Sequence, residues 1–105
     1  FEWVVENLLK NSLDALQGHG EISVKISATE STVNISVSDT GKGIAKSNWK
    51  RIFEPGYTTK TRGWGLGLSL SRRVVEEYHR GKIAVTDSVI GKGTTIRITL
   101  KRVFE

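Results

Sequence analysis

Four stretches of the chain carry residue types that suit a phosphate-bearing ligand and its metal ion. A predicted helix bears Asn7 and Asn11, and glycine-rich segments follow it at residues 39–43, 63–68 and 91–94. Glycine pairs also make ordinary turns, so no single segment is informative by itself. Their combination and order indicate a phosphate-bearing ligand that lies across one edge of a sheet.

The asparagines of the first predicted helix lie on one stripe. Asn7, Asn11 and Asp14 are spaced i, i+4 and i+7, which places them on the same side of a helix. Asparagine is locally unfavourable in mid-helix because its amide competes with the backbone. Its oxygen is a neutral, hard donor that suits one position of an octahedral Mg²⁺. A polar, solvated helix face explains the same residues equally well, so both interpretations stay open here.

Asp39 follows an alternating apolar segment and precedes Gly41 and Gly43. Glycine allows a planar ligand to approach the backbone closely. A carboxylate only accepts hydrogen bonds, so it suits the exocyclic amine of adenine. The alternative is a simple turn in which Asp39 accepts a hydrogen bond from its own backbone.

The second glycine-rich segment directly precedes a predicted helix with Ser69 and Ser71 in its first turns. Free amides and the dipole at a helix N-terminus favour anions. The spacing differs from the dinucleotide fingerprint, because the third glycine comes one residue early. Gly93 stands where a P-loop requires Ser or Thr, so neither of these phosphate loops is supported. The alternating glycines are Gly63, Gly65 and Gly67.

Composition excludes several other classes of protein. With 105 residues the chain suits one domain with a real core. It has no Cys, which excludes disulfides and thiolate chemistry, and no apolar run near the roughly 20 residues of a membrane span. His19 and His79 lie at predicted helix ends and are interpreted as capping or surface residues. The chain begins with Phe1 inside a predicted helix, so we expect a fragment of a longer protein.

The formal net charge of +5 is concentrated in the middle of the chain. Ten Lys and Arg residues lie between positions 42 and 82, against three Glu. This distribution suits an anionic partner, either nucleotide phosphates or a nucleic acid. For Arg72, Arg73 and Arg80 we favour a solvated helix face.

Hydrophobic periodicity predicts the order α-β-β-α-loop-α-β-β. The first half reads as a helix at 2–17, an antiparallel hairpin of strands at 22–28 and 33–37 with one buried face, and a short helix at 46–53. The inward residues of the first helix are predicted to be Val5, Leu8, Leu9, Leu13 and Leu16.

The second half begins with an aperiodic loop at 55–65. A helix at 67–79 and strands at 82–86 and 94–100 follow, which predicts a sheet covered by helices on one face. The helix is predicted to point Leu68, Leu70, Val74, Val75 and Tyr78 inward.

Together these segments resemble the ATP-binding catalytic domain of sensor histidine kinases, within the superfamily that includes gyrase B, Hsp90 and MutL. The resemblance covers nearly the whole chain. It matches the Asn box at 6–15, the first glycine box at 39–44, the Phe box at 52–60, the second glycine box at 63–68 and the final Gly-Thr element at 91–94.

The resemblance implies a role for each matching residue. Asn11 would hold Mg²⁺, with Asn7 beside the phosphates, and Asp39 would bind the adenine amine with support from Thr94. Lys60 would reach the phosphates, and residues 56–64 would form a lid over ATP. Gly41 and Gly43 would let the backbone approach the base, and Gly65, Gly67 and Leu68 would cradle the phosphates.

The implied fold is a two-layer α/β sandwich, with a mixed, mostly antiparallel sheet covered on one face by about three helices. The implied function is to bind Mg-ATP and to donate the γ-phosphate to a histidine on a separate dimerisation domain, in two-component signalling. A response regulator would be the downstream partner, the parent protein a homodimer and the fragment a monomer. A cytoplasmic location is implied, with or without a membrane anchor in the parent protein, and nucleic acid is not an implied partner.

Two features of the chain depart from relatives of this superfamily. Water-activating relatives such as gyrase B carry Glu four residues before the magnesium-binding asparagine, where this chain has Asn7. An amide cannot act as a general base, and Glu6 is rotated by about a third of a turn, so ATP hydrolysis is disfavoured. The lid is also short, with few residues between Lys60 and Gly63, and Gly56 stands where a second aromatic residue is common.

Two rival functions follow from the same residues. An ATPase-driven clamp would need the carboxylate that position 7 lacks. A nucleic-acid-binding module would need aromatic platforms on a sheet face, whereas Trp3, Trp49 and Trp64 all fall in predicted helices or the lid.

Overall fold

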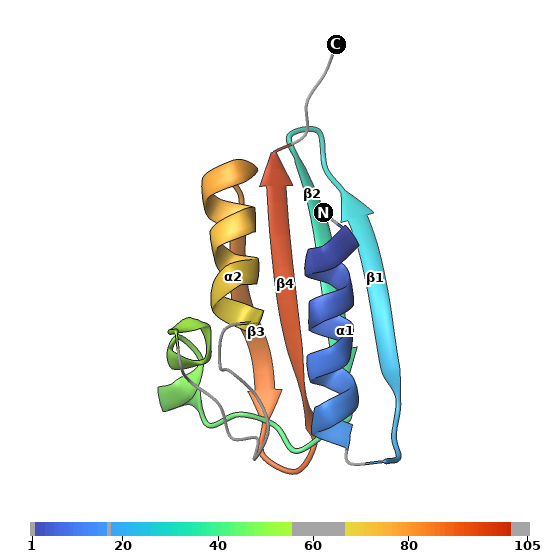
Figure 1. The fold of residues 1–105 in the computed structure, drawn as a ribbon. Helices are drawn as coiled ribbons and strands as arrows, with labels where there is room; N and C mark the ends of the chain where they lie inside the picture. Colours follow the sequence, from blue (N-terminus) through green and yellow to red (C-terminus); the bar gives the residue numbers. More distant parts are fainter. Residues whose placement is uncertain (1, 17, 56–66, 102–105) are drawn as a thin grey trace.

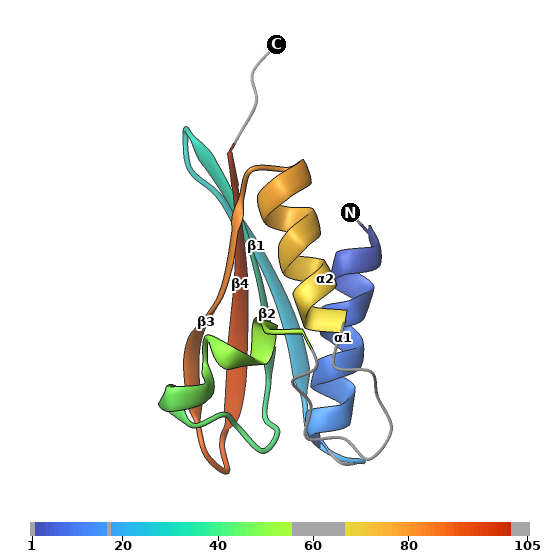
Figure 2. The same ribbon diagram turned by 60° about the vertical axis from the view of Figure 1, so that its left-hand side comes forward.

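The computed structural model describes residues 2–16, 18–55 and 67–101. Its strands form one four-stranded sheet in the order β1-β2-β4-β3, and all pairings between these strands are antiparallel. In the described part of the chain the helices all lie on one face of the sheet (Figures 1 and 2). The elements are α1 (Glu2–Leu16), β1 (Ile22–Ala28), β2 (Thr32–Asp39), η1 (Lys46–Asn48), η2 (Arg51–Phe53), α2 (Gly67–Arg73), η3 (Val74–Tyr78), β3 (Lys82–Val89) and β4 (Gly93–Lys101).

This architecture confirms the predicted two-layer sandwich and the order of its elements. The predicted loop at 55–65 and the proposed lid at 56–64 fall almost entirely outside the described residues. Neither α1 nor α2, in the part that is described, has the length and apolar character of a membrane-spanning helix.

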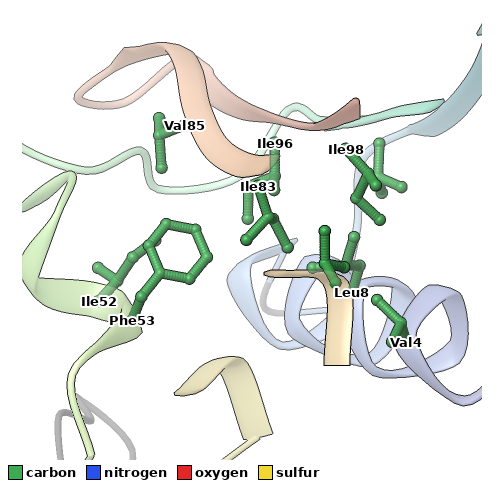
Figure 3. Packing of buried hydrophobic residues seen from close by; sticks show 10 residues of the cluster. Val4, Leu8, Ile52, Phe53, Ile83, Val85, Ile96 and Ile98 are labelled. Atoms are coloured by element: carbon green, nitrogen blue, oxygen red, sulfur yellow. The ribbon is translucent and has the colours of Figure 1, made fainter. Parts of the chain in front are cut away.

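The core lies between the sheet and the helices, as Figure 3 shows. Alternate residues of each strand share a face, so Ile96 and Ile98 of β4 both point toward the helices. Val4 and Leu8, which lie one turn apart on α1, belong to the same buried cluster as these isoleucines. The buried apolar residues are Val4, Leu8, Val37, Ile52, Phe53, Val75, Ile83, Val85, Ile96 and Ile98.

The side chains of the edge strand β1 are less buried than the sequence predicted. Val24 and Ile26 pair with Val37 and Ile35, so their side chains lie on the helix-covered face, yet both are exposed. The reason is that α1 lies mainly over β2 and leaves β1 beside it (Figure 1). Leu13 on α1 is also exposed, so its predicted inward position is wrong.

The second long helix is not α-helical throughout. Residues Gly67–Arg73 are α-helical, and Val74–Tyr78 continue as a π-helical segment. Ser71 and Val75 are fully buried, whereas the predicted inward residues Leu70 and Tyr78 are exposed. Leu70 is one residue out of the buried stripe, and the wider π-helical turn rotates Tyr78 away from it.

The predicted short helix at 46–53 is two separate 3-10 turns, η1 and η2. Ile52 and Phe53 of η2 are buried and pack toward Val85 and Ile83 of β3 (Figure 3). Trp49 between the turns donates its indole N–H to the carbonyl of Ile44, 3.0 Å away. This bond ties the two turns to the segment that precedes them.

Candidate functional site

Four elements that carry predicted site residues converge at one end of the sandwich. The C-terminal half of α1, the end of β2 and the beginning of β4 lie toward the lower end of the view in Figure 1, and α2 begins nearer the middle with its first turn facing that end. Asn11, Asp39, Gly67 and Thr94 come from these four elements in turn. The fold therefore brings together segments that lie far apart in the sequence.

Asp39 and Thr94 form one wall of this site. They are direct partners in the β2–β4 ladder, so their side chains share the helix-covered face of the sheet. Thr94 is buried and Asp39 is half-buried. One oxygen of the carboxylate, Oδ1, accepts a hydrogen bond from the Gly41 backbone N–H at 2.9 Å. The turn predicted as an alternative for Asp39 thus exists, and it uses one of the two carboxylate oxygens.

The segment after Asp39 is held between α1 and the β3–β4 turn. The Lys42 N–H donates to the Ala15 carbonyl at 3.1 Å, and the Lys42 carbonyl accepts from the Gly91 N–H at 2.8 Å. A Cβ on Gly41 would lie 2.6 Å from the Ala15 oxygen, and one on Gly43 would overlap the backbone of Val89. Both glycines are therefore required by close contacts within the chain, a reason that sequence reasoning did not identify.

Ser88 supports this wall, and it was not identified as a site residue from the sequence. Its hydroxyl accepts a hydrogen bond from the Ile44 N–H at 2.7 Å. The same hydroxyl lies 2.8 Å from Thr94 Oγ1 and 3.0 Å from the Gly93 carbonyl. Ser88 and Thr94 are ladder partners across the short β3–β4 connection, and that pairing is the signal that would have identified it.

Asn7 and α2 form the opposite wall. The side-chain nitrogen of Asn7 donates to Ser71 Oγ at 2.8 Å, and Ser71 Oγ donates to the Gly67 carbonyl at 2.9 Å. A Cβ on Gly67 would lie 2.8 Å from Asn7 Oδ1. The first helix and the start of the second are thus joined through a half-buried amide that lies against a glycine.

Asn11 lies one turn after Asn7, as its spacing predicted. It is half-buried, and its side-chain nitrogen donates to the Asn7 carbonyl at 2.8 Å. This bond commits the nitrogen end of the amide to the helix backbone. Asp14, predicted on the same stripe, is exposed.

The remaining predicted site residues divide into two groups. Leu68 is half-buried and packs against the core beside Gly67. Lys60 and Gly65 lie outside the described residues, so their predicted places at the phosphates stay predictions.

A family model described as histidine kinase-, DNA gyrase B-, and HSP90-like ATPase matches residues 1–103. Sporulation kinase E of Bacillus subtilis is 46% identical over 95 residues, which are 90% of this chain and 13% of that protein. Sensor histidine kinase ZraS of Escherichia coli K12 is 45% identical over 97 residues, 92% of this chain and 20% of its own length. The chain thus spans a fifth or less of either protein.

Solved structures show the same likeness. The catalytic domain of histidine kinase ThkA superposes with a TM-score of 0.82 at 32% identity, over 93% of this chain and 64% of that one. The mycobacterial sensor histidine kinase MprB superposes with a TM-score of 0.83 at 26% identity, over 94% of this chain and 68% of that one. The extent of the family match establishes that the chain belongs to the histidine kinase-, DNA gyrase B- and HSP90-like ATPases.

Proposed function

We propose that residues 1–105 are the ATP-binding catalytic domain of a sensor histidine kinase. The domain would bind Mg-ATP and donate the γ-phosphate to a histidine on a separate dimerisation domain, from which a response regulator would receive it. The observation that carries this proposal is that α1 joins two walls of predicted site residues: its Ala15 carbonyl accepts from the Lys42 N–H just after Asp39, and its Asn7 donates to Ser71 of α2. One wall holds Asp39 and Thr94, and the other holds Asn7, Asn11 and Gly67.

Asp39 and Thr94 suit the adenine base. With Oδ1 occupied by the Gly41 N–H, the second carboxylate oxygen can accept a hydrogen bond from an exocyclic amine. The Thr94 hydroxyl lies on the same face and can bond to the base edge directly or through water. Gly41 and Gly43 would lie beside the base, and the phosphates would extend toward Asn7, Lys60, Gly65, Gly67 and Leu68.

The side chains also fit Mg²⁺ that arrives with the nucleotide. Asn11 and Asn7 offer neutral amide oxygens, and within the described ranges no three His, Asp or Glu side chains gather as a metal cluster. Such a donor set supplies few of the six positions that Mg²⁺ prefers and leaves the others for phosphate oxygens and water. Bound Mg²⁺ would neutralise charge on the phosphates, and we assign its protein contact to Asn11.

Catalysis would depend on positioning and charge neutralisation, as in other phosphoryl transfers. Position 7 is an amide, so it cannot activate water as a general base. The neighbouring carboxylate of Glu6 is exposed, as its rotation around the helix predicted. This arrangement favours transfer to a histidine over hydrolysis.

The proposal is tested by phosphate transfer in trans. The chain is first titrated with Mg-ATP by calorimetry, and then incubated with labelled Mg-ATP alone or with a dimerisation domain that carries the acceptor histidine. We expect binding, no label on the chain alone, and label on the added domain. A matched acceptor with His replaced by Gln should stay unlabelled.

Other outcomes would contradict the proposal. Absence of Mg-ATP binding would refute the nucleotide site. Sustained ATP hydrolysis by the chain alone would instead favour an ATPase-driven clamp, and label on the chain itself would refute a separate acceptor.

A further inference from the structure

The orientation of the Asn7 amide is set by a chain of two hydrogen bonds between α1 and α2. Asn7 donates to Ser71 Oγ at 2.8 Å, and Ser71 donates to the Gly67 carbonyl at 2.9 Å. Ser71 is 0% exposed, so water cannot replace either partner. The hydroxyl therefore lies at a dry contact between the two helices.

The direction of these bonds follows from the number of protons. A serine hydroxyl has one proton to donate, and here it goes to the carbonyl of Gly67. The oxygen of Ser71 can then only accept, so Asn7 must turn its NH₂ group toward Ser71. Its carbonyl oxygen, Oδ1, is thereby the atom that Ser71 does not bond, and it lies beside Gly67 at the start of α2.

Gly67 limits how the amide can move. A Cβ at this position would lie 2.8 Å from Asn7 Oδ1 and 3.0 Å from Nδ2. The whole amide therefore lies against the backbone at the start of α2. Only a residue without a side chain leaves room for it, so Gly67 and Ser71 together hold the amide from two directions.

We infer that Ser71 is a positioning residue that makes Asn7 present a hydrogen-bond acceptor to the phosphate end of the nucleotide. This inference rests on the proposed function, which places phosphates near Asn7. Phosphate oxygens are themselves acceptors, so Oδ1, the atom that Ser71 does not bond, suits a donor such as metal-bound water. An amide turned the other way would show its NH₂ group to the phosphates instead.

The test uses a matched pair of variants at position 71. Ser71→Thr keeps the hydroxyl and Ser71→Val replaces it with a methyl group, and the two side chains have nearly the same branched shape. For Mg-ATP we expect Ser71→Thr to bind within about twofold of wild type, and Ser71→Val about three- to tenfold more weakly. Ser71→Ala, which removes the hydroxyl without adding volume, should resemble Ser71→Val.

Binding of AMP distinguishes a positioning role of Ser71 from a general destabilisation of the fold by the substitutions. AMP lacks the β- and γ-phosphates, so all three variants should bind AMP like wild type. Equal weakening of AMP and Mg-ATP by Ser71→Val would show a merely structural role and overturn the inference. When Asn7 is also replaced by Ala, the Ser71→Thr and Ser71→Val variants should bind Mg-ATP equally well.

A spectroscopic measurement tests the hydrogen bond without nucleotide. The side-chain NH₂ protons of Asn7 should exchange with solvent more slowly in wild type and Ser71→Thr than in Ser71→Val. Equal exchange in all three would overturn the proposed orientation.

The two proposals can fail separately. If wild type binds Mg-ATP and the Thr and Val variants bind alike, the role of Ser71 is refuted and the proposed function stands. If wild type does not bind Mg-ATP, the proposed function is refuted, and with it the ligand role of Asn7.

Discussion

Asp39 at the end of β2 lies directly opposite Thr94 at the beginning of β4, and both side chains share the helix-covered face of the sheet. The pair lies beyond Val37 and Ile96, the last buried apolar partners of the same ladder. The polar pair thus begins where the core ends. A flat, apolar base could pack against the end of the core while its polar edge meets Asp39 and Thr94.

Asp39→Asn should separate base recognition from turn formation. The amide oxygen can still accept the Gly41 N–H, so the turn is kept, but the second oxygen becomes an NH₂ group that repels an exocyclic amine. We expect Mg-ATP affinity to fall at least about tenfold, because a hydrogen-bond donor at position 39 would face the donor of the exocyclic amine in place of an acceptor. Calorimetry measures the affinity, and thermal unfolding should stay close to wild type.

Asp87→Asn provides the matched control, because Asp87 is exposed on β3. It should bind Mg-ATP like wild type. If Asp39→Asn also binds like wild type, the adenine assignment is wrong.

Ser88→Ala should destabilise the fold. The Ile44 N–H would lose its 2.7 Å acceptor, and an unsatisfied, partly buried donor costs about 1–3 kcal/mol of the free energy of unfolding. Urea unfolding measures this loss. Ser36→Ala, which removes only an exposed 3.3 Å bond from Arg97, should change the free energy by less than about 0.5 kcal/mol. Equal effects of the two substitutions would contradict a supporting role for Ser88.

The elements of this fold were predictable because their signals are local. The 3.6-residue period of residues 2–16 and the alternation at 22–28 depend only on neighbouring side chains, and both elements form as expected. Which of their apolar residues are buried was less predictable. Ile26 is exposed because α1 lies mainly over β2 rather than over β1, and that depends on where α1 packs across the whole sheet.

The site was predictable in its residues but not in its supports. Asn7, Asp39 and Thr94 belong to recognisable segments. Ser71 was interpreted only as part of a helix N-terminus, because a serine among apolar residues gives no periodic signal. Its position four residues after Gly67 and four before the buried Val75 marks it as inward, and only the packing of α2 on α1 shows its partner.

Ile98 and Ile26 offer a matched test of the core boundary. Each pairs with Ile35 from opposite sides on the same face, yet Ile98 is 0% exposed and Ile26 is 68% exposed. Ile98→Ala should lower the free energy of unfolding by about 2–5 kcal/mol. Ile26→Ala should lower it by less than about 1 kcal/mol, mainly through strand propensity. Urea unfolding of both variants checks this, and similar losses would show that β1 is covered in solution.

Arg73→Ala should have little effect on either stability or binding. Its guanidinium lies 2.9 Å from Glu77 one turn later, on an exposed helix face, and that bond raises the pKa of Arg73. An exposed i, i+4 pair contributes about 0.3–0.5 kcal/mol, less at high salt. We therefore expect Mg-ATP affinity within about twofold of wild type, whereas Lys60→Ala should weaken it clearly. Strong weakening by Arg73→Ala would instead place this helix face in the anion site.

Asn11→Ala should remove the magnesium dependence of ATP binding. Loss of the amide oxygen removes the protein contact that we assign to the metal. Loss of a group that only supports a metal ligand already weakens metal affinity by about 10- to 100-fold, so we expect at least about a tenfold loss here. Alanine is also a better helix former than asparagine, so the helix should persist. Calorimetric titration with ATP, in Mg²⁺ and in EDTA, measures the effect as the ratio of the two dissociation constants. That ratio should approach one for Asn11→Ala and remain as in wild type for Glu6→Gln, an exposed neighbour on the same helix. A ratio unchanged by Asn11→Ala would move the metal contact to another residue, with Asn7 the first to test, because its oxygen faces away from Ser71.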